Sequence, residues 1–302
     1  MGTLHTCAIL NQLFEASVLN DSFSAPERQC PICASSHLVP DFRLKTHEDL
    51  VLCWARCAFC GFTFMNPRLA LEKMKTIYRS SGYWNEMSYG VYLASEPIRL
   101  KNALRNWRFF SCFLPQSGRL LDIGCATGFF GAAATKHGYD VVGIDPAEEL
   151  VDFGRRMYGL DLRTTTIEEA FFDPASFDVV SLWGTDSHFY DVRAGFTKIV
   201  DWLRPGGHFL FSYQNYGHWI RFFFPQIKQA ANVYYNLTKT SCHLLMRQLG
   251  LDILAERTAI QTFQLQRLVR TLGVTKARWP RLESLKITLP TISYKILVAR
   301  KR

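Results

Sequence analysis

The stretch Leu120-Leu121-Asp122-Ile123-Gly124-Cys125-Ala126-Thr127-Gly128-Phe129-Phe130 predicts a buried strand, a glycine-bearing turn and the start of a helix. Apolar residues flank one acid, Asp122, and a charge in such a strand is costly unless it has a partner. Gly124 and Gly128 let the backbone turn sharply and approach a ligand closely, because neither carries a side chain. We therefore expect a ligand site at this turn.

The glycine spacing narrows the choice of ligand. Dinucleotide sites typically have G-x-G-x-x-G, which seats a pyrophosphate on the helix N-terminus. Here residue 126 is Ala and the pattern is D-x-G-x-x-x-G, which suits a smaller polar ligand with a cationic group near the acid. A second apolar strand ends in Asp145, and an acid at that place holds ribose hydroxyls in doubly wound sheets. The alternative is a Rossmann-type unit that binds NAD or no ligand.

These residues resemble motif I and the following acidic strand end of the class I S-adenosylmethionine-dependent methyltransferases. The resemblance implies that the turn binds the methionine part of S-adenosyl-L-methionine and that the second acid binds its ribose. The adenine would pass the loop at Ile167 and Glu168, although Glu168 fits a solvated loop acid equally well. The cofactor-binding residues expected on this basis are Tyr83, Asp122, Gly124, Cys125, Gly128, Asp145, Pro146, Ile167, Glu168, Trp183 and Gly184.

Apolar runs separated by turn signals predict an α/β fold with a Rossmann-like seven-stranded sheet. The turn Leu203-Arg204-Pro205-Gly206-Gly207 is also familiar from the class I methyltransferases. We expect a long connection at 257–293 with a helix near 265–272. The expected strands are 120–123, 140–144, 162–167, 177–183, 208–212, 251–256 and 294–299, and the expected helices include 95–114, 130–137 and 147–158.

Two C-x-x-C pairs lie near the N-terminus, at Cys30-Pro31-Ile32-Cys33 and at Cys57-Ala58-Phe59-Cys60. Two such pairs are typical of zinc knuckles, which place four thiolates tetrahedrally around Zn²⁺. Four thiolates leave no open position for water, so we expect a structural zinc held by Cys30, Cys33, Cys57 and Cys60. Cys53 is a fifth thiol, either buried or a substitute for one ligand.

The order of motifs also resembles a methyltransferase group that carries an N-terminal zinc ribbon and includes sugar C-methyltransferases. Asn66-Pro67-Arg68 and then Gly82-Tyr83-Trp84 follow the knuckles. Aromatic residues around Tyr83 fit either a lid over the cofactor or a packing stripe. We expect an N-terminal extension at 1–28, the zinc ribbon at 29–68, a helical lid or linker at 69–116 and the methyltransferase domain at 117–302, with a substrate-wall insertion near 213–236.

Composition limits the possible classes of protein. The chain has 302 residues, 48% of them hydrophobic, and a formal net charge of +9 that is not concentrated in one long run. This charge can attract phosphates or acidic surfaces, but no dedicated nucleic-acid arm is visible. Residues 1–6 lack the features of a secretion signal, and no apolar run is long enough to predict a transmembrane helix. We expect a cytoplasmic protein in which clustered cysteines bind metal.

The protein part of methyl transfer is mainly the positioning of the acceptor, because the cofactor carries the leaving group. His188 is the expected base, since its ordinary pKa lies near neutral and it follows the fourth strand; Tyr213 is a weaker candidate. A small-molecule acceptor, such as a sugar or another metabolite, is the preferred hypothesis. The alternatives are an RNA methyltransferase that uses the zinc ribbon to bind RNA, and a non-enzymatic binding subunit. The acceptor and the oligomeric state do not follow from the sequence.

Overall fold

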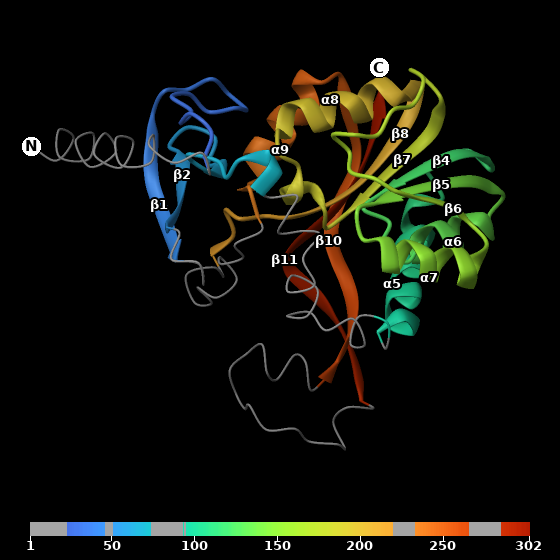
Figure 1. Cartoon of the computed structure of the whole chain (residues 1–302). Helices are drawn as coiled ribbons and strands as arrows, with labels where there is room; N and C mark the ends of the chain where they lie inside the picture. The colour runs from blue at the N-terminus through green and yellow to red at the C-terminus, as the bar shows by residue number, and fades with distance from the viewer. Residues whose placement is uncertain (1–22, 46–50, 74–92, 94, 220–232, 266–284) are drawn as a thin grey trace, which may run out of the picture.

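A computed structural model of the chain describes residues 23–45, 51–73, 93, 95–219, 233–265 and 285–302. Within these ranges the strands form two sheets (Figure 1). The larger sheet contains β4 (Gly118–Ile123), β5 (Tyr139–Asp145), β6 (Asp161–Thr164), β7 (Phe177–Trp183), β8 (Leu203–Gln214), β10 (Leu251–Gln264) and β11 (Lys286–Lys301).

The larger sheet has the order β10-β11-β8-β7-β4-β5-β6. The strands from β6 to β8 pair in parallel, whereas β11 runs antiparallel to both β8 and β10. The parallel strands therefore end at one edge, with β4 and β7 side by side where ligands bind in open α/β sheets. The predicted Rossmann-like seven-stranded α/β fold is confirmed.

Helices cover both faces of this sheet, because the strands carry apolar side chains on both sides. The helices are α5 (Glu96–Phe110), α6 (Phe129–Thr135), α7 (Glu148–Tyr158), α8 (Val192–Trp202) and α9 (Lys239–Gln248), with a short 3₁₀ turn, η1 (Asp186–His188). Trp107 of α5 and Phe130 of α6 pack on Leu120, while Phe196 of α8 belongs to the core on the other face. Burial of such side chains is the main stabilising contribution.

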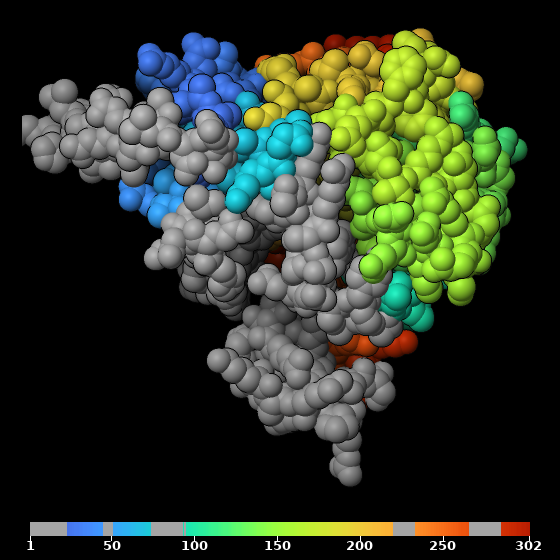
Figure 2. All heavy atoms as spheres, viewed as in Figure 1, coloured from blue at the N-terminus to red at the C-terminus, as the bar shows by residue number. Residues whose placement is uncertain are grey.

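The smaller sheet contains β1 (Leu38–Lys45), β2 (Val51–Cys57), β3 (Thr63–Met65) and β9 (Tyr235–Asn236), in that order. We call residues 30–65 the cysteine module. The fourth strand of the smaller sheet, β9, lies outside this module: it comes from the predicted substrate-wall segment near 213–236 and pairs with β3. Figure 2 shows the cysteine module in blue beside the yellow and green part of the molecule, with cyan residues between them.

The expected connection at 257–293 is wrong where the structure describes it. β10 and β11 continue as one antiparallel pair, with Thr262 opposite Thr288 and Gln264 opposite Lys286. Cross-strand pairing stabilises such a ribbon, and its β-branched residues suit strands. The helix expected near 265–272 falls almost entirely outside the described residues.

Smaller differences concern element ends. The third strand stops at Thr164 rather than at residue 167, and the helix before the first strand stops at Phe110 rather than at residue 114. None of the helices in the described ranges is both long and apolar enough to cross a membrane.

Candidate functional site

The glycine turn joins β4 to α6 at the edge where the parallel strands end. Gly124 has φ +68° and Gly128 has φ +77°, a region that side chains disfavour. A Cβ atom on Gly124 would lie 2.2 Å from Thr185 Oγ1, just past the end of β7. Glycine is therefore required at position 124 both for the backbone conformation and for this close contact.

Asp145 ends β5 beside the same turn. Its Oδ2 accepts the backbone N–H of Ala126 and its Oδ1 accepts that of Ala147, each at 2.9 Å. The side chain is buried, and burial raises the pKa of the carboxyl to about 6 against the lowering effect of these two bonds. The backbone thus fixes an acid at the place where ribose hydroxyls bind in this kind of sheet.

Asp122 lies in β4 and is 1% exposed. The hydroxyl of Ser181 in β7 donates to Asp122 Oδ1 at 2.6 Å, which provides the partner that a buried acid requires. Burial and, to a smaller degree, the nearby charge of Asp145 raise the pKa of Asp122 to about 7, against the lowering effect of the Ser181 bond. Sequence patterns alone did not identify Ser181, because it is distant in the chain and pairs with Asp122 only across the sheet.

The side chain of Cys125 points away from the turn. It packs with Val151 and Leu162, and a Cβ atom on Gly143 would lie 2.8 Å from its Sγ. Burial raises the pKa of this thiol well above its usual range. Only the backbone of Cys125 belongs to the turn, where its N–H donates to the carbonyl of Ile144 at 3.1 Å.

A buried network behind the turn was not expected from the sequence. Glu96, at the start of α5, accepts hydrogen bonds from Thr127 Oγ1 at 2.8 Å and from the hydroxyl of Tyr158 at 2.6 Å. These bonds connect α5, the turn and the end of α7. A serine before Glu96 and the acid itself are ordinary helix-start signals, so no pattern in the sequence indicated this second role.

The predicted adenine loop is held from two sides. Glu168 Oε1 accepts the backbone N–H of Tyr190 at 2.9 Å, and Lys198 Nζ donates to the carbonyls of Ile167 and Glu168. The Glu168 carboxylate is therefore already hydrogen-bonded within the protein, while Ile167 is buried and Pro146, next to Asp145, is exposed.

Trp183 and Gly184 lie at the end of β7. The Trp183 ring packs on Phe130, with ring centroids 4.6 Å apart. Gly184 N donates to Ser212 Oγ at 3.0 Å, and that hydroxyl lies 2.7 Å from the hydroxyl of Tyr294. The ends of β7 and β8 are thus linked to β11 by polar contacts that connect residues far apart in the sequence.

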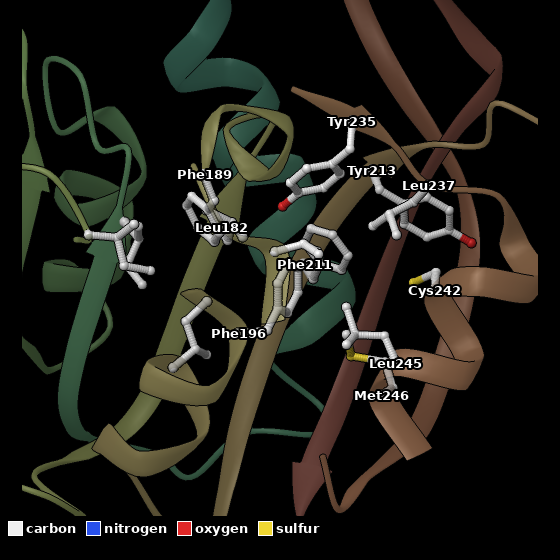
Figure 3. Packing of buried hydrophobic residues seen from close by; sticks show 14 of the residues in the cluster. Leu182, Phe189, Phe196, Phe211, Tyr213, Tyr235, Leu237, Cys242, Leu245 and Met246 are labelled. Carbon is white, nitrogen blue, oxygen red and sulfur yellow. The ribbon is translucent and has the colours of Figure 1, made fainter. Parts of the chain in front are cut away.

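The two predicted catalytic residues lie in different surroundings. His188 is in η1, directly beyond β7, and is half-buried. Tyr213 is fully buried, and its hydroxyl donates to Glu256 at 2.6 Å, toward β10 (Figure 3). Burial raises the pKa of Tyr213 far above its usual range. This position does not support a role for Tyr213 as a base, and Tyr83 lies outside the described residues.

The four predicted zinc ligands come together in the cysteine module. Their Sγ atoms all lie within 4.8 Å of one another, with 3.6 Å between Cys30 and Cys60 and 3.5 Å between Cys33 and Cys57. Tetrahedral Zn²⁺ with Zn–S bonds of about 2.3 Å needs sulfur separations of about 3.8 Å. The donor set therefore fits a structural zinc, and Cys53 does not belong to the cluster.

Both knuckles are attached to the larger unit. Arg193, at the start of α8, donates to the carbonyls of Pro31 and Ile32 at 2.9 and 2.8 Å. The Thr238 hydroxyl, which caps α9, donates to the carbonyl of Cys60 at 2.7 Å. The cysteine module is consequently fixed to the starts of two helices that pack on the sheet.

Comparison with known families gives a match over more than half of the chain. Residues 96–268 match the family described as a methyltransferase domain. This range includes the glycine turn, both acidic strand ends and β7.

Curated relatives match a shorter part of the chain. The ubiquinone biosynthesis O-methyltransferase of Xylella fastidiosa is 32% identical over 142 residues, which is 44% of this chain and 54% of the relative. The same enzyme of Bradyrhizobium is 36% identical over 110 residues, or 34% of this chain and 42% of the relative. The chain thus spans about half the length of the curated relatives it matches.

Solved structures share the fold. The 1,6-didemethyltoxoflavin-N1-methyltransferase of Burkholderia thailandensis, solved with S-adenosylhomocysteine, has a TM-score of 0.51 at 16% identity and covers 87% of this chain and 98% of its own. The YcgJ protein of Bacillus subtilis has a TM-score of 0.50 at 16% identity, with 66% and 98% covered. At such identities the likeness concerns the fold alone.

Proposed function

The chain belongs to the methyltransferase domain family, and on this premise we propose that it transfers the methyl group of S-adenosylmethionine to a small-molecule acceptor. The observation that carries the proposal is the glycine turn, with Asp145 held by two backbone amides beside it. An acid at the strand end beside such a turn suits a ribose.

In this proposal, the cofactor lies across the ends of β4 and β5. The backbone at Gly124, Cys125 and Gly128 borders its methionine part, and Asp145 binds its ribose. Asp122 acts within this site through its bond to Ser181, which fixes β4 against β7. Pro146, Ile167, Glu168, Trp183 and Gly184 remain proposed neighbours of the cofactor, together with Tyr83.

We propose oxygen as the methylated atom. The curated relatives that match this chain are named O-methyltransferases, which supports oxygen over carbon or nitrogen. A sugar or another secondary metabolite remains a possible acceptor class within this proposal. Zn²⁺ is proposed as a structural ion on Cys30, Cys33, Cys57 and Cys60, where it supplies a cross-link and no chemistry.

Isothermal titration with S-adenosylhomocysteine tests the proposal. Zinc-replete protein should bind the compound at a one-to-one ratio, and the affinity should fall about 10- to 100-fold in Gly124→Ala. No heat from well-folded protein would overturn the assignment. A release assay for S-adenosylhomocysteine with phenols, sugars and bulk RNA then identifies the acceptor class, because RNA as the sole productive acceptor would favour the nucleic-acid alternative.

A further inference from the structure

Four acids are buried in the described part of the chain: Glu96, Asp122, Asp145 and Asp186. Three of them have hydrogen-bond donors that offset their burial. Glu96 has two hydroxyls, Asp122 has the Ser181 hydroxyl, and Asp145 has two backbone amides. These three carboxylates are therefore accounted for by the architecture around the glycine turn.

Asp186 differs from the other three. It is 6% exposed, yet no side chain among the described residues donates a hydrogen bond to its carboxylate. The donors near it are its own backbone N–H and that of Ser187. A buried carboxylate with so few donors is costly, and such groups are concentrated at functional sites.

The location of Asp186 is suited to the acceptor. It is the first residue of η1, directly after Thr185, whose side chain contacts the glycine turn. Burial, and to a smaller degree the charge of Asp186, raises the pKa of Tyr294 in β11 and of Cys242 in α9. Asp186 therefore lies just beyond the end of β7, next to the residue that contacts the glycine turn.

We propose that Asp186 accepts the proton of the hydroxyl group that is methylated, and that the acceptor is a neutral alcohol or phenol. This inference rests on the proposed function and deepens it. In the reaction, the acceptor O–H bond breaks and its proton moves to a carboxylate oxygen of Asp186. The acceptor oxygen bonds to the sulfonium methyl carbon, and the C–S bond breaks with its electron pair left on sulfur. The products are a methyl ether, S-adenosylhomocysteine and a neutral Asp186.

The surroundings of Asp186 fit this role. Burial raises the pKa of the carboxyl to about 7, so that near neutral pH it can be ionised and still hold a proton after the reaction. The nearby titratable groups on other elements, Tyr294 and Cys242, both have a raised pKa and are neutral at that pH. Arg99 is a cation whose charge acts on Tyr294 from α5.

The variant Asp186→Asn tests the proposal, because it keeps the side-chain shape and removes the proton acceptor. With catechol, a neutral phenol, as the probe acceptor, kcat should fall about 100-fold or more. The affinity for S-adenosylhomocysteine should change by less than about threefold, since the variant side chain does not contact the cofactor turn. The acid-side inflection near pH 7 in the kcat/KM profile should disappear.

Two further variants complete the comparison. Asp191→Asn makes the same chemical change five residues later, where the side chain caps α8 by accepting the N–H of Ala194, and Asn also serves as a cap. It should retain wild-type kcat. His188→Gln tests the other candidate base: a large loss of kcat in this variant, with Asp186→Asn active, would overturn the proposal.

A second measurement requires no turnover. In the S-adenosylhomocysteine complex, infrared difference spectra between wild type and Asp186→Asn should isolate a protonated-carboxyl band that titrates near pH 7 and shifts when catechol is added. A carboxyl that is ionised well below neutral pH, or a band that the catechol leaves unchanged, would contradict the inference. Failure of wild-type protein to bind S-adenosylhomocysteine would instead count against the proposed function.

Discussion

At the edge of the larger sheet where the parallel strands end, the half at β4 and β5 differs from the half at β7 and β8 in how its residues are brought together. In the half at β4 and β5, the acids and their backbone donors come from residues 122–147, and Asp145 is held by amides within that stretch. In the half at β7 and β8, the hydrogen-bonded residues come from distant parts of the chain: Gly184 follows β7, Ser212 lies in β8 and Tyr294 lies in β11. In the proposed function, one continuous stretch therefore binds the cofactor, whereas residues from distant parts of the chain surround the acceptor.

The largest predicted effect disturbs the half at β7 and β8 and leaves cofactor binding at β4 and β5 intact. Cys57→Ser should remove a zinc ligand and lower the melting temperature by more than about 10 °C, because structural zinc contributes strongly to folding. Methyl transfer should be lost, since the cysteine module is attached to α8 and α9. Residual folded protein should still bind S-adenosylhomocysteine by calorimetry. Cys112→Ser, at an exposed thiol outside the cluster, is the control and should change neither property.

The next prediction concerns a variant that disturbs the half at β4 and β5. Gly124→Ala places a Cβ atom 2.2 Å from Thr185 Oγ1 at a positive φ, so the turn must shift. Affinity for S-adenosylhomocysteine should fall about 10- to 100-fold, as expected for overpacking that costs about 1–3 kcal/mol. Gly206→Ala is the matched control, because Gly206 also has a positive φ but a Cβ atom added there would have no neighbour within 4 Å. Equal binding by the two variants would contradict the proposed position of the cofactor.

The third prediction concerns the contribution of Asp186 to the pH dependence of the free energy of unfolding. Burial raises its pKa to about 7 from an ordinary value near 3.9, so the folded state holds more protons than the unfolded state between these values. The contribution of Asp186 to the free energy of unfolding therefore decreases as the pH rises from about 4 to 7. Because one pKa unit corresponds to about 1.4 kcal/mol, the decrease should reach a few kcal/mol.

Urea denaturation of ligand-free protein at pH 5 and pH 7.5 measures this effect. Asp186→Asn should lose less stability than wild type between the two values, and the difference isolates one group from all others that titrate. If both proteins show the same change, Asp186 does not titrate in this range in the folded state.

The smallest effect concerns the attachment of the cysteine module. Arg193→Ala removes the bonds to the carbonyls of Pro31 and Ile32, and we expect a loss of about 1–3 kcal/mol in the free energy of unfolding. Zinc content should remain one ion per chain, and kcat should decrease more than affinity for S-adenosylhomocysteine. Arg163→Ala, which removes an exposed pair with Asp161, is the control and should cost less than about 1 kcal/mol.

The sequence supported accurate predictions where the interactions are local. The strand 177–183 agrees with β7, and the four cysteine ligands cluster as their spacing predicted. The order of the glycine turn and the acidic strand ends was enough to predict the Rossmann-like fold, because backbone geometry restricts those positions to particular residues. The domain boundaries and the individual cofactor contacts remain predictions.

Interactions between distant residues could not be predicted in the same way. The length of β10 and β11 depends on their mutual pairing, and the partner of the Tyr213 hydroxyl, Glu256, lies 43 residues later in the chain. Asp186 was overlooked in favour of His188, since an ordinary pKa near neutral favours histidine and the burial that raises a carboxyl pKa is invisible in the sequence. The only sequence feature that could have indicated Asp186 as a proton acceptor was the presence of an acid just after the fourth strand.

Because β9 is synthesised long after β3, the smaller sheet cannot be completed early in translation. Thr238, whose hydroxyl donates to Cys60, is made 178 residues after that cysteine. At translation rates of about 5–20 residues per second, β9 is synthesised roughly 10 to 35 s after β1, β2 and β3. During that interval the nascent chain has all four thiols but not the edge that completes their support, so metal loading during translation would protect the unfinished N-terminal part from oxidation and mispairing.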